Sequence, residues 1–315
     1  MKRKVLFLDS VHPNLFDRLK NAGYNCVHAE DKGLDFIYEE SSIVFGLVVR
    51  ARFYMDKEFL SRFKNLRFIA RSGSGLENID YDYCRQNNIA LFNSPEGNRN
   101  AVAEHALALL MGCMNNIYIA NDEIKKGFWN RESNRGEELK GKTVGIIGFG
   151  HNGRAFAEKL VAFGVTILAH DKYISIPNEN GIINSSLEMI FNQADVVSLH
   201  LPLTDETHYY ADDVFFSQFS KPIYFINISR GKIVETSALV RAIQSRKIKA
   251  SGLDVLEFEA QSFESLFNKE IPAPLLFLMN APNVILTPHI AGWTQESHIL
   301  LSDVLADKIL SFSFL

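Results

Sequence analysis

The sequence predicts an α/β fold built from two doubly wound parallel-sheet domains. Short, apolar, β-branched segments alternate with helical segments along almost the whole chain. Continuous apolar runs, such as residues 43–49, are typical of parallel strands that are buried on both faces. A length of 315 residues is enough for two separate cores. We expect one domain to comprise residues 1–98 and 292–315, and the other residues 99–291.

The first hundred residues predict a small parallel sheet with its crossover helices. Residues 93–98 are rich in turn formers, which predicts a break in the chain. A long helix is expected over residues 101–126, and its early part is apolar around most of its circumference. Such a helix is buried between domains or against another subunit. The expected strands are residues 5–8, 25–29, 43–49, 67–70 and 89–92, and the expected helices are residues 13–22, 56–63 and 81–87.

The alternation resumes after a polar linker at residues 131–140. Residues 257–283 lack a clear period and are expected to be irregular. A last helix, residues 295–310, follows the final strand and is free to pack on the first domain. The expected strands are residues 143–147, 165–169, 196–201, 224–228, 250–255 and 284–286, and the expected helices are residues 154–162, 186–192, 212–218 and 235–245.

A glycine-rich turn between residues 143 and 171 predicts a dinucleotide site. Gly148 allows a tight turn from strand to helix, Gly150 lets backbone approach a pyrophosphate, and Gly153 allows close helix packing. The free N–H groups of the helix N-terminus favour phosphate. Asp171 ends the next strand, where a carboxylate accepts from a ribose hydroxyl and repels a 2′-phosphate, so NAD is favoured over NADP. Lys172 follows it directly, and a basic residue at that place argues against a strict preference for NAD. A turn without a ligand is the alternative, which the flanking elements disfavour.

Composition narrows the possible partners. A formal net charge of -4 argues against nucleic-acid or membrane-surface binding through bulk charge. No apolar run reaches the length that spans a bilayer. Cys26, Cys84 and Cys113 form neither a metal-binding pattern nor an even set for disulfides. We therefore expect no metal site, and buried thiols in the reducing cytoplasm.

Two basic side chains follow predicted strands, at the sheet edge where open α/β folds bind ligands. Arg230 could hold a carboxylate through two parallel hydrogen bonds and polarise a neighbouring carbonyl. A surface arginine at a loop edge fits the pattern equally well. His289 follows the last strand, and a lone histidine there is more often structural than catalytic.

Acidic residues and a second glycine turn give further candidates. Asp254 lies within an apolar run, so its carboxylate needs a donor. That donor could be a nicotinamide carboxamide, a core hydrogen bond or a helix terminus. Glu257 is expected to face solvent, whereas Glu259 is ambiguous. Residues 71–75, Arg-Ser-Gly-Ser-Gly, could form a cup of N–H groups for an anion or a simple flexible turn.

Taken together, these stretches resemble the NAD-dependent D-2-hydroxyacid dehydrogenases, including the phosphoglycerate dehydrogenase and glycerate or hydroxypyruvate reductase branch. The resemblance implies a flavodoxin-like substrate domain, a Rossmann NAD-binding domain and NAD as cofactor. It implies interconversion of a small D-2-hydroxy acid and its 2-keto acid, with 3-phosphoglycerate, glycerate and glyoxylate chemistry as candidates. The matching stretches keep the family's order and are residues 71–80, 101–107, 145–150, 227–231, 253–255 and 287–292.

The same resemblance implies roles for individual residues. Arg230 would bind the substrate's carboxylate and carbonyl, and His289 would donate and accept the proton. Glu259 would pair with His289, and Asp254 would contact the nicotinamide end of the cofactor. The other implied cofactor-binding residues are Gly148, Gly150, His151, Asn152, Gly153, Asp171, Pro202 and Ser229. The implied substrate-binding residues are Arg50, Ser74, Gly75 and Asn98.

Some positions depart from the family pattern or leave alternatives open. Ala51 replaces a small hydroxyl residue beside Arg50, which weakens the case for a phosphorylated substrate, and Ala260 stands where many members have proline. Formate dehydrogenases pair their histidine with glutamine, so the glutamate at position 259 disfavours an assignment to that branch. A nucleotide-sensing binding protein of the corepressor type is the alternative to an enzyme. The apolar helix at residues 101–126 predicts a homodimer through the NAD-binding domain.

Overall fold

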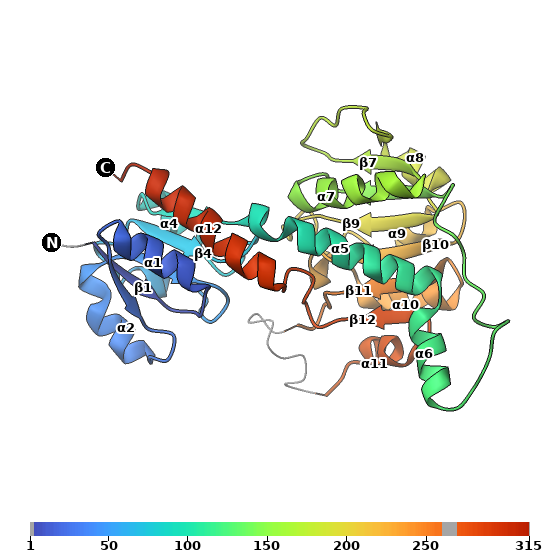
Figure 1. Cartoon of the computed structure of the whole chain (residues 1–315), viewed down its shortest axis with the longest axis horizontal. Helices are drawn as coiled ribbons and strands as arrows, with labels where there is room; N and C mark the ends of the chain where they lie inside the picture. Colours follow the sequence, from blue (N-terminus) through green and yellow to red (C-terminus); the bar gives the residue numbers. More distant parts are fainter. Residues whose placement is uncertain (1–2, 260–269, 315) are drawn as a thin grey trace. The chain divides into compact units, whose positions relative to one another are not determined.

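The computed structural model describes residues 3–259 and 270–314. These residues divide into two compact units: residues 3–99 with 293–314, and residues 100–259 with 270–292. Each unit contains one parallel sheet with helices packed around it, so the predicted α/β fold class is confirmed (Figure 1). Ala260 lies outside the described residues. Among the helices that are described, none has the length and apolarity needed to cross a bilayer.

The first unit has a five-stranded sheet in the order β2-β1-β3-β4-β5, which is the flavodoxin-like order. Its core lies on both faces of the sheet, because β1 and β3 are apolar almost throughout. Helix α12 packs against α1, and Asn14 Nδ2 donates to Asp303 at 3.2 Å. The elements are β1 (Lys4–Phe7), α1 (Pro13–Asn21), β2 (Asn25–His28), α2 (Leu34–Glu40), β3 (Val44–Val49), α3 (Lys57–Leu60), β4 (Phe68–Arg71), α4 (Tyr81–Gln86), β5 (Ala90–Asn93) and α12 (Gln295–Ser311).

The second unit has a seven-stranded parallel sheet in the order β12-β11-β10-β9-β6-β7-β8. The chain runs outward from β6 to β8 and then returns to β9 on the other side of β6. The strand order therefore reverses between β6 and β9, which is where such sheets bind ligands. The elements are α5 (Pro95–Met114), which begins in the first unit, α6 (Ile117–Lys125), β6 (Thr143–Ile147), α7 (His151–Leu160), β7 (Thr166–His170), β8 (Ile182–Asn184), α8 (Leu187–Gln193), β9 (Val196–Leu199), α9 (Asp213–Ser217), β10 (Ile223–Asn227), α10 (Thr236–Gln244), β11 (Ile248–Leu253), α11 (Ala273–Asn280) and β12 (Val284–Leu286).

The expected helix at residues 101–126 is in fact two helices, α5 and α6. Asn116 separates them with a φ of 51°, a left-handed conformation that asparagine tolerates better than most residues. The expected break at residues 93–98 is also wrong in part, because α5 already begins at Pro95. Proline suits a first helical turn, and Gly97 lets the helix lie against the backbone of Leu301.

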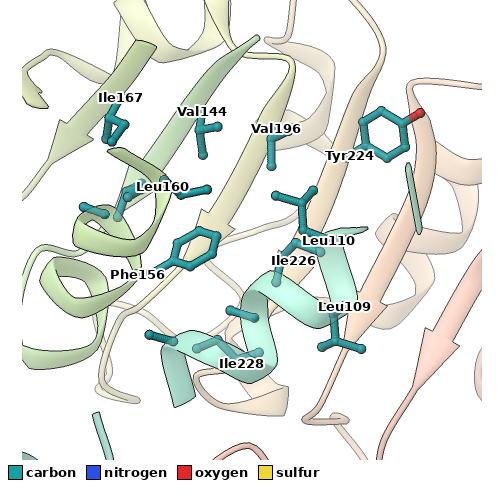
Figure 2. Close-up of a cluster of buried hydrophobic side chains, with 14 of the residues drawn as sticks. Leu109, Leu110, Val144, Phe156, Leu160, Ile167, Val196, Tyr224, Ile226 and Ile228 are labelled. Carbon is teal, nitrogen blue, oxygen red and sulfur yellow. The ribbon is translucent and has the colours of Figure 1, made fainter. Parts of the chain in front are cut away.

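The apolar circumference of α5 is explained by burial inside the second unit. Leu109 and Leu110 pack into the same cluster as Val144, Val196 and Ile226 from the strands (Figure 2). These α5 side chains are at most 2% exposed, so they have no free surface to offer to another subunit. Exposed apolar residues follow on α6 and just beyond it.

Three further elements differ from expectation. Helix α2 has seven residues and strand β8 has three, so each is too short to show a clear period of apolar residues. Helix α11 lies within residues 257–283, where an irregular segment was expected. Its eight residues begin after Pro272 and are apolar around the helix, so no helical period is visible in them.

His200 follows β9 and gives the second unit a predictable sensitivity to acid. Burial lowers the pKa of its imidazole from 6.5 to about 3, and its Nδ1 has no exposed surface. The imidazole of His200 in the unfolded chain therefore binds a proton near pH 6.5, whereas in the folded chain it stays neutral at that pH. This contribution to stability is complete above pH 6.5 and decreases as the pH falls toward 3.

We expect the free energy of unfolding to fall by about 2 kcal/mol between about pH 7.5 and pH 5 on this account. Urea unfolding of the wild type and of His200→Gln at several pH values measures it. The variant should lose most of this slope, whatever its stability at neutral pH. Equal slopes in the two proteins would contradict the prediction.

Candidate functional site

The candidate residues of the second unit follow strands of a single parallel sheet. Parallel strands end at the same edge, so the loops after them lie along the carboxyl edge of that sheet. The glycine turn follows β6, directly at the point where the strand order reverses. The other candidates are Asp171 after β7, Pro202 after β9, Ser229 and Arg230 after β10, Asp254 and Glu259 after β11, and His289 after β12.

The three glycines of the turn have different structural roles. Gly148 has a φ of 91°, and a Cβ there would lie 2.5 Å from the carbonyl oxygen of His200. A Cβ on Gly153 would lie 2.1 Å from the carbonyl oxygen of Gly148, so only glycine permits this packing of α7. A Cβ on Gly150 would meet nothing within 4 Å. Gly148 and Gly153 thus serve the fold, whereas Gly150 borders open space.

The start of α7 fits the pyrophosphate of a dinucleotide. Gly150 is the N-cap of α7 and supplies no side-chain cap, so the first N–H groups are left for a ligand. His151 is exposed in the first turn. Asn152 Oδ1 is buried without a hydrogen-bond partner among the described residues, which is the kind of atom a ligand would satisfy.

Asp171 is fixed beside this turn. Its Oδ2 accepts from the N–H of Phe149 at 2.7 Å, and its Oδ1 accepts from the N–H of Tyr173 at 2.8 Å. Lys172 forms an ion pair with Glu206, whose carboxylate also accepts from the hydroxyl of Tyr173. The positive charge that followed Asp171 in the sequence is therefore balanced by a neighbouring acid.

The different roles of two glycines give a testable contrast. We expect Gly153→Ala to destabilise the protein by about 3 kcal/mol, because the new methyl group overlaps a backbone oxygen. Gly150→Ala should leave stability nearly unchanged and weaken NADH binding instead. Urea unfolding and NADH fluorescence titration separate the two effects. A stable Gly153→Ala protein would contradict this reading of the turn.

The structure brings His289 and Glu259 together although thirty residues separate them in the chain. Nδ1 of His289 lies 2.8 Å from Oε2 of Glu259, and the two side chains are 23% and 15% exposed. The other carboxylate oxygen of Glu259 accepts from the N–H of Leu256. His289 has a φ of 56°, an uncommon conformation for a residue other than glycine.

Asp254 finds its donors inside the chain. Its carboxylate accepts from Thr287 Oγ1 at 2.6 Å and from the N–H groups of Ile290 and Ala291 at 2.9 and 2.8 Å. His105 Nε2 lies 3.4 Å from Oδ1. Burial alone would raise the pKa of Asp254, but these donors outweigh it and hold the pKa below its usual range. Core hydrogen bonds, one of the alternatives considered from the sequence, therefore supply donors to this carboxylate.

Glu257 is not the solvent-facing residue that we expected. Its Oε2 accepts from the N–H of Thr236 at 2.9 Å, which satisfies the first turn of α10. Its Oε1 accepts from the hydroxyl of Tyr209 at 2.6 Å, and this bond raises the pKa of Tyr209 to about 12. Glu257 thus serves as a hydrogen-bond acceptor for the N-terminus of α10. The linear sequence did not indicate this contact.

Asn227 builds the turn that carries Ser229 and Arg230. It is 1% exposed, and its Oδ1 accepts from Ser229 Oγ at 2.8 Å while its Nδ2 donates to the carbonyl of Arg230 at 3.1 Å. The guanidinium of Arg230 donates through Nη1 to the carbonyl of Ser229 at 2.6 Å. A Cβ on Gly231 would lie 2.0 Å from the carbonyl oxygen of Leu256, so glycine must follow. After β9, the exposed Pro202 accepts from Thr207 Oγ1 through its carbonyl.

The first unit brings together two of its own candidates. Ser74 Oγ donates to Asn98 Oδ1 at 2.8 Å, and the carbonyl of Ser74 accepts from Asn93 at 2.6 Å. Gly75 is half-buried in the same loop.

Arg50 lies beside a tryptophan that the sequence did not single out. Its guanidinium carbon is 3.9 Å from the ring centroid of Trp293, and its backbone N–H donates to Asp9 Oδ2 at 2.5 Å. In the sequence, Trp293 directly follows residues 287–292, the matching stretch that contains His289. That position is the feature from which Trp293 could have been predicted as a site residue. Within residues 3–259 and 270–314, no group of three or more His, Cys, Asp or Glu side chains is arranged to hold a metal ion.

Comparisons with known proteins agree with this architecture. Residues 107–291 match the family model described as the D-isomer specific 2-hydroxyacid dehydrogenase, NAD binding domain. Hydroxypyruvate reductase of Thermotoga maritima is 34% identical over 263 residues, which cover 84% of this chain and 83% of that protein. D-3-phosphoglycerate dehydrogenase of Archaeoglobus fulgidus is 31% identical over 312 residues, which cover 98% of this chain and 57% of that protein.

A solved structure extends the likeness to three dimensions. The crystal structure of D-lactate dehydrogenase from Aquifex aeolicus, complexed with NAD and lactic acid, superposes with a TM-score of 0.84 and 28% identity. The match covers 98% of this chain and 95% of that one. This chain therefore belongs to the D-isomer specific 2-hydroxyacid dehydrogenase family. Its second unit carries that family's NAD-binding domain. The chain spans little more than half the length of the archaeal relative.

Proposed function

We propose that this protein is an NAD-dependent oxidoreductase that interconverts a small D-2-hydroxy acid and its 2-keto acid. The observation that carries the proposal is the pairing of His289 Nδ1 with the Glu259 carboxylate at 2.8 Å. The pair lies at the edge of a sheet whose first strand ends in the dinucleotide turn. A histidine held by a carboxylate, a charged arginine and a nucleotide turn are the parts that keto acid reduction needs.

In this proposal the side chains divide the work. Arg230 binds the substrate carboxylate through parallel hydrogen bonds and stabilises the carbonyl oxygen as negative charge develops on it. His289 gives its Nε2 proton to that oxygen, and takes it back in the reverse direction. Glu259 accepts from Nδ1 and so fixes the ring orientation and the tautomer. The start of α7 and Asp171 would hold NADH, which would supply the hydride when bound.

The two units would divide the ligands. The second unit is the proposed cofactor domain, bounded near residues 99 and 291. The first unit is the proposed substrate domain, where the turn at Ser74 and Gly75 offers N–H groups to a carboxylate. Asn98 supports that turn through Ser74. Arg50, already stacked on Trp293, is the proposed contact for a further polar group of the substrate.

The candidate substrates are hydroxypyruvate, glyoxylate and phosphohydroxypyruvate with their 2-hydroxy acids. A panel of these keto acids and pyruvate, assayed with NADH and with NADPH, tests the proposal. We expect reduction of at least one acid, with NADH preferred over NADPH because of Asp171. Tight NADH binding without turnover of any acid would instead support a nucleotide-sensing binding protein.

A homodimer through the second unit is also part of the proposal, and exposed apolar residues on and after α6 support it. Phe128 and Trp129 are 58% and 78% exposed, and a patch of this kind is expected to be covered by a partner. A second copy of the chain fits because these exposed residues are apolar and lie near one another in the sequence, on α6 and just after it. Its other members are Ile117, Tyr118 and Ile124.

Light scattering at micromolar concentration measures the assembly directly. We expect twice the chain mass of 35.6 kDa for the wild type and the monomer mass for Trp129→Glu. A wild-type monomer would remove the dimer from the proposal without affecting the proposed reaction.

A reducing compartment, the cytoplasm, completes the proposal. Cys84 and Cys113 are buried and free, and burial raises the pKa of both thiols to about 12. Protonated, buried thiols react slowly and are typical of proteins that fold under reducing conditions.

A further inference from the structure

His105 takes no part in the proposed reaction, yet it lies behind the turn that carries His289. It projects from α5, and its Nε2 lies 3.0 Å from Thr287 Oγ1. We propose that His105 is a positioning residue. Acting through Thr287 and Asp254, it fixes the backbone of residues 287–291, which we call the histidine turn, and thereby the imidazole of His289.

The direction of each hydrogen bond follows from the carboxylate at the end of the series. A carboxylate only accepts, so Thr287 Oγ1 donates its single proton to Asp254 Oδ1 across 2.6 Å. Because that proton is used, Thr287 can only accept from His105. His105 therefore carries its proton on Nε2, where it also faces Asp254 Oδ1 at 3.4 Å.

Asp254 in turn holds three successive N–H groups of the histidine turn. Its backbone carbonyl accepts from His289 at 2.8 Å, and its carboxylate accepts from Ile290 and Ala291. His289 needs this support because its φ of 56° is unfavourable for a residue with a Cβ. The side chain of Asp254 is 1% exposed, so water has poor access to replace a missing donor.

Removing His105 therefore weakens the support of the turn without touching the reacting atoms. The Asp254 carboxylate would lose a neighbouring donor, and Thr287 would lose the group that orients its hydroxyl. The imidazole of His289 would then sample positions away from Glu259. The catalytic consequence rests on the proposed function, whereas the effect on the histidine turn does not.

Amide hydrogen exchange and steady-state kinetics of His105→Leu and His105→Gln test the proposal on the full chain. For His105→Leu we expect about tenfold faster exchange at Ile290 and Ala291, with exchange at Phe225 in β10 unchanged. The turnover number should fall about 10- to 100-fold, while NADH affinity stays the same. The glutamine variant keeps a donor at this position and should recover part of both effects.

Thr287→Val and the double variant provide the coupling. If His105 acts through Thr287, the double variant should be no worse than the more impaired single variant. His28→Leu, an exposed histidine of the first unit, is the matched control and should change neither quantity. Unchanged exchange in the turn, or equally faster exchange at Phe225, would overturn the proposal. The exchange result decides this even if the wild type reduces none of the keto acids, so the two proposals can fail separately.

Discussion

Replacing His289 with asparagine is expected to lower the turnover number for keto acid reduction by about 1,000-fold. Asparagine keeps the size and polarity of the side chain but cannot exchange a proton near neutral pH. The hydrogen bonds from residues 289–291 to Asp254 come from the backbone and remain available in the variant. Stopped-flow and steady-state assays with the best acid of the panel measure the loss.

NADH affinity separates this loss from misfolding. The glycine turn and Asp171 are on other loops, so fluorescence titration should give the wild-type dissociation constant for His289→Asn. Glu259→Gln is the companion variant, because glutamine can still contact Nδ1 but without charge. Its turnover should lie between those of the wild type and His289→Asn. Near-normal turnover of His289→Asn would remove this residue from the proposed chemistry.

Replacing Arg230 with lysine is expected to lower kcat/KM by about 1,000-fold, or about 4 kcal/mol of transition-state stabilisation. A guanidinium presents two parallel donors to a carboxylate, whereas an ammonium presents a single point of charge. The hydrogen bond from Asn227 remains available in the variant, because it goes to the carbonyl of Arg230 and not to its side chain. The lost energy therefore reports on the guanidinium, including its hydrogen bond to the carbonyl of Ser229.

The control for this variant is Lys232→Gln, at an exposed cation two residues along the chain. It removes one positive charge from the neighbourhood, which Arg230→Lys does not, and it leaves the proposed substrate contacts untouched, so kcat/KM should remain close to wild type. Comparable losses in both variants would indicate that kcat/KM responds to any change of a side chain in this loop. In that case Arg230 would have no specific role in binding the keto acid.

Local patterns predicted most of the architecture. Apolar runs marked the strands of both sheets because a parallel strand buried on both faces leaves no polar alternation. The glycine turn was readable for a similar reason, since the strand, the glycines, the helix and the acid lie within thirty residues. Elements with weaker local signals, such as α2 and α11, were missed. The break at Asn116 was missed because the apolar pattern continues across it.

The site was predictable only as separate pieces. Residue types and family resemblance indicated His289 and Glu259, but their meeting depends on β11 and β12 being neighbours in the sheet. The hydrogen-bond donors of Asp254 and Glu257 were harder to predict. The two carboxylates are three residues apart, and no local feature of the sequence indicates which donor each of them contacts. No role for His105 was predicted from the sequence, although it lies in residues 101–107, a stretch that matches the family.

By itself the sequence determined the fold class, the dinucleotide turn and the kinds of side chain that end each strand. These follow from backbone sterics and from the period of burial, which act over a few residues. Tertiary structure decided which of those side chains share hydrogen bonds: Glu259 with His289, Asp254 with the histidine turn, and Glu257 with α10. Such pairings depend on strand order and on helix packing, which bring together residues that are distant in the chain.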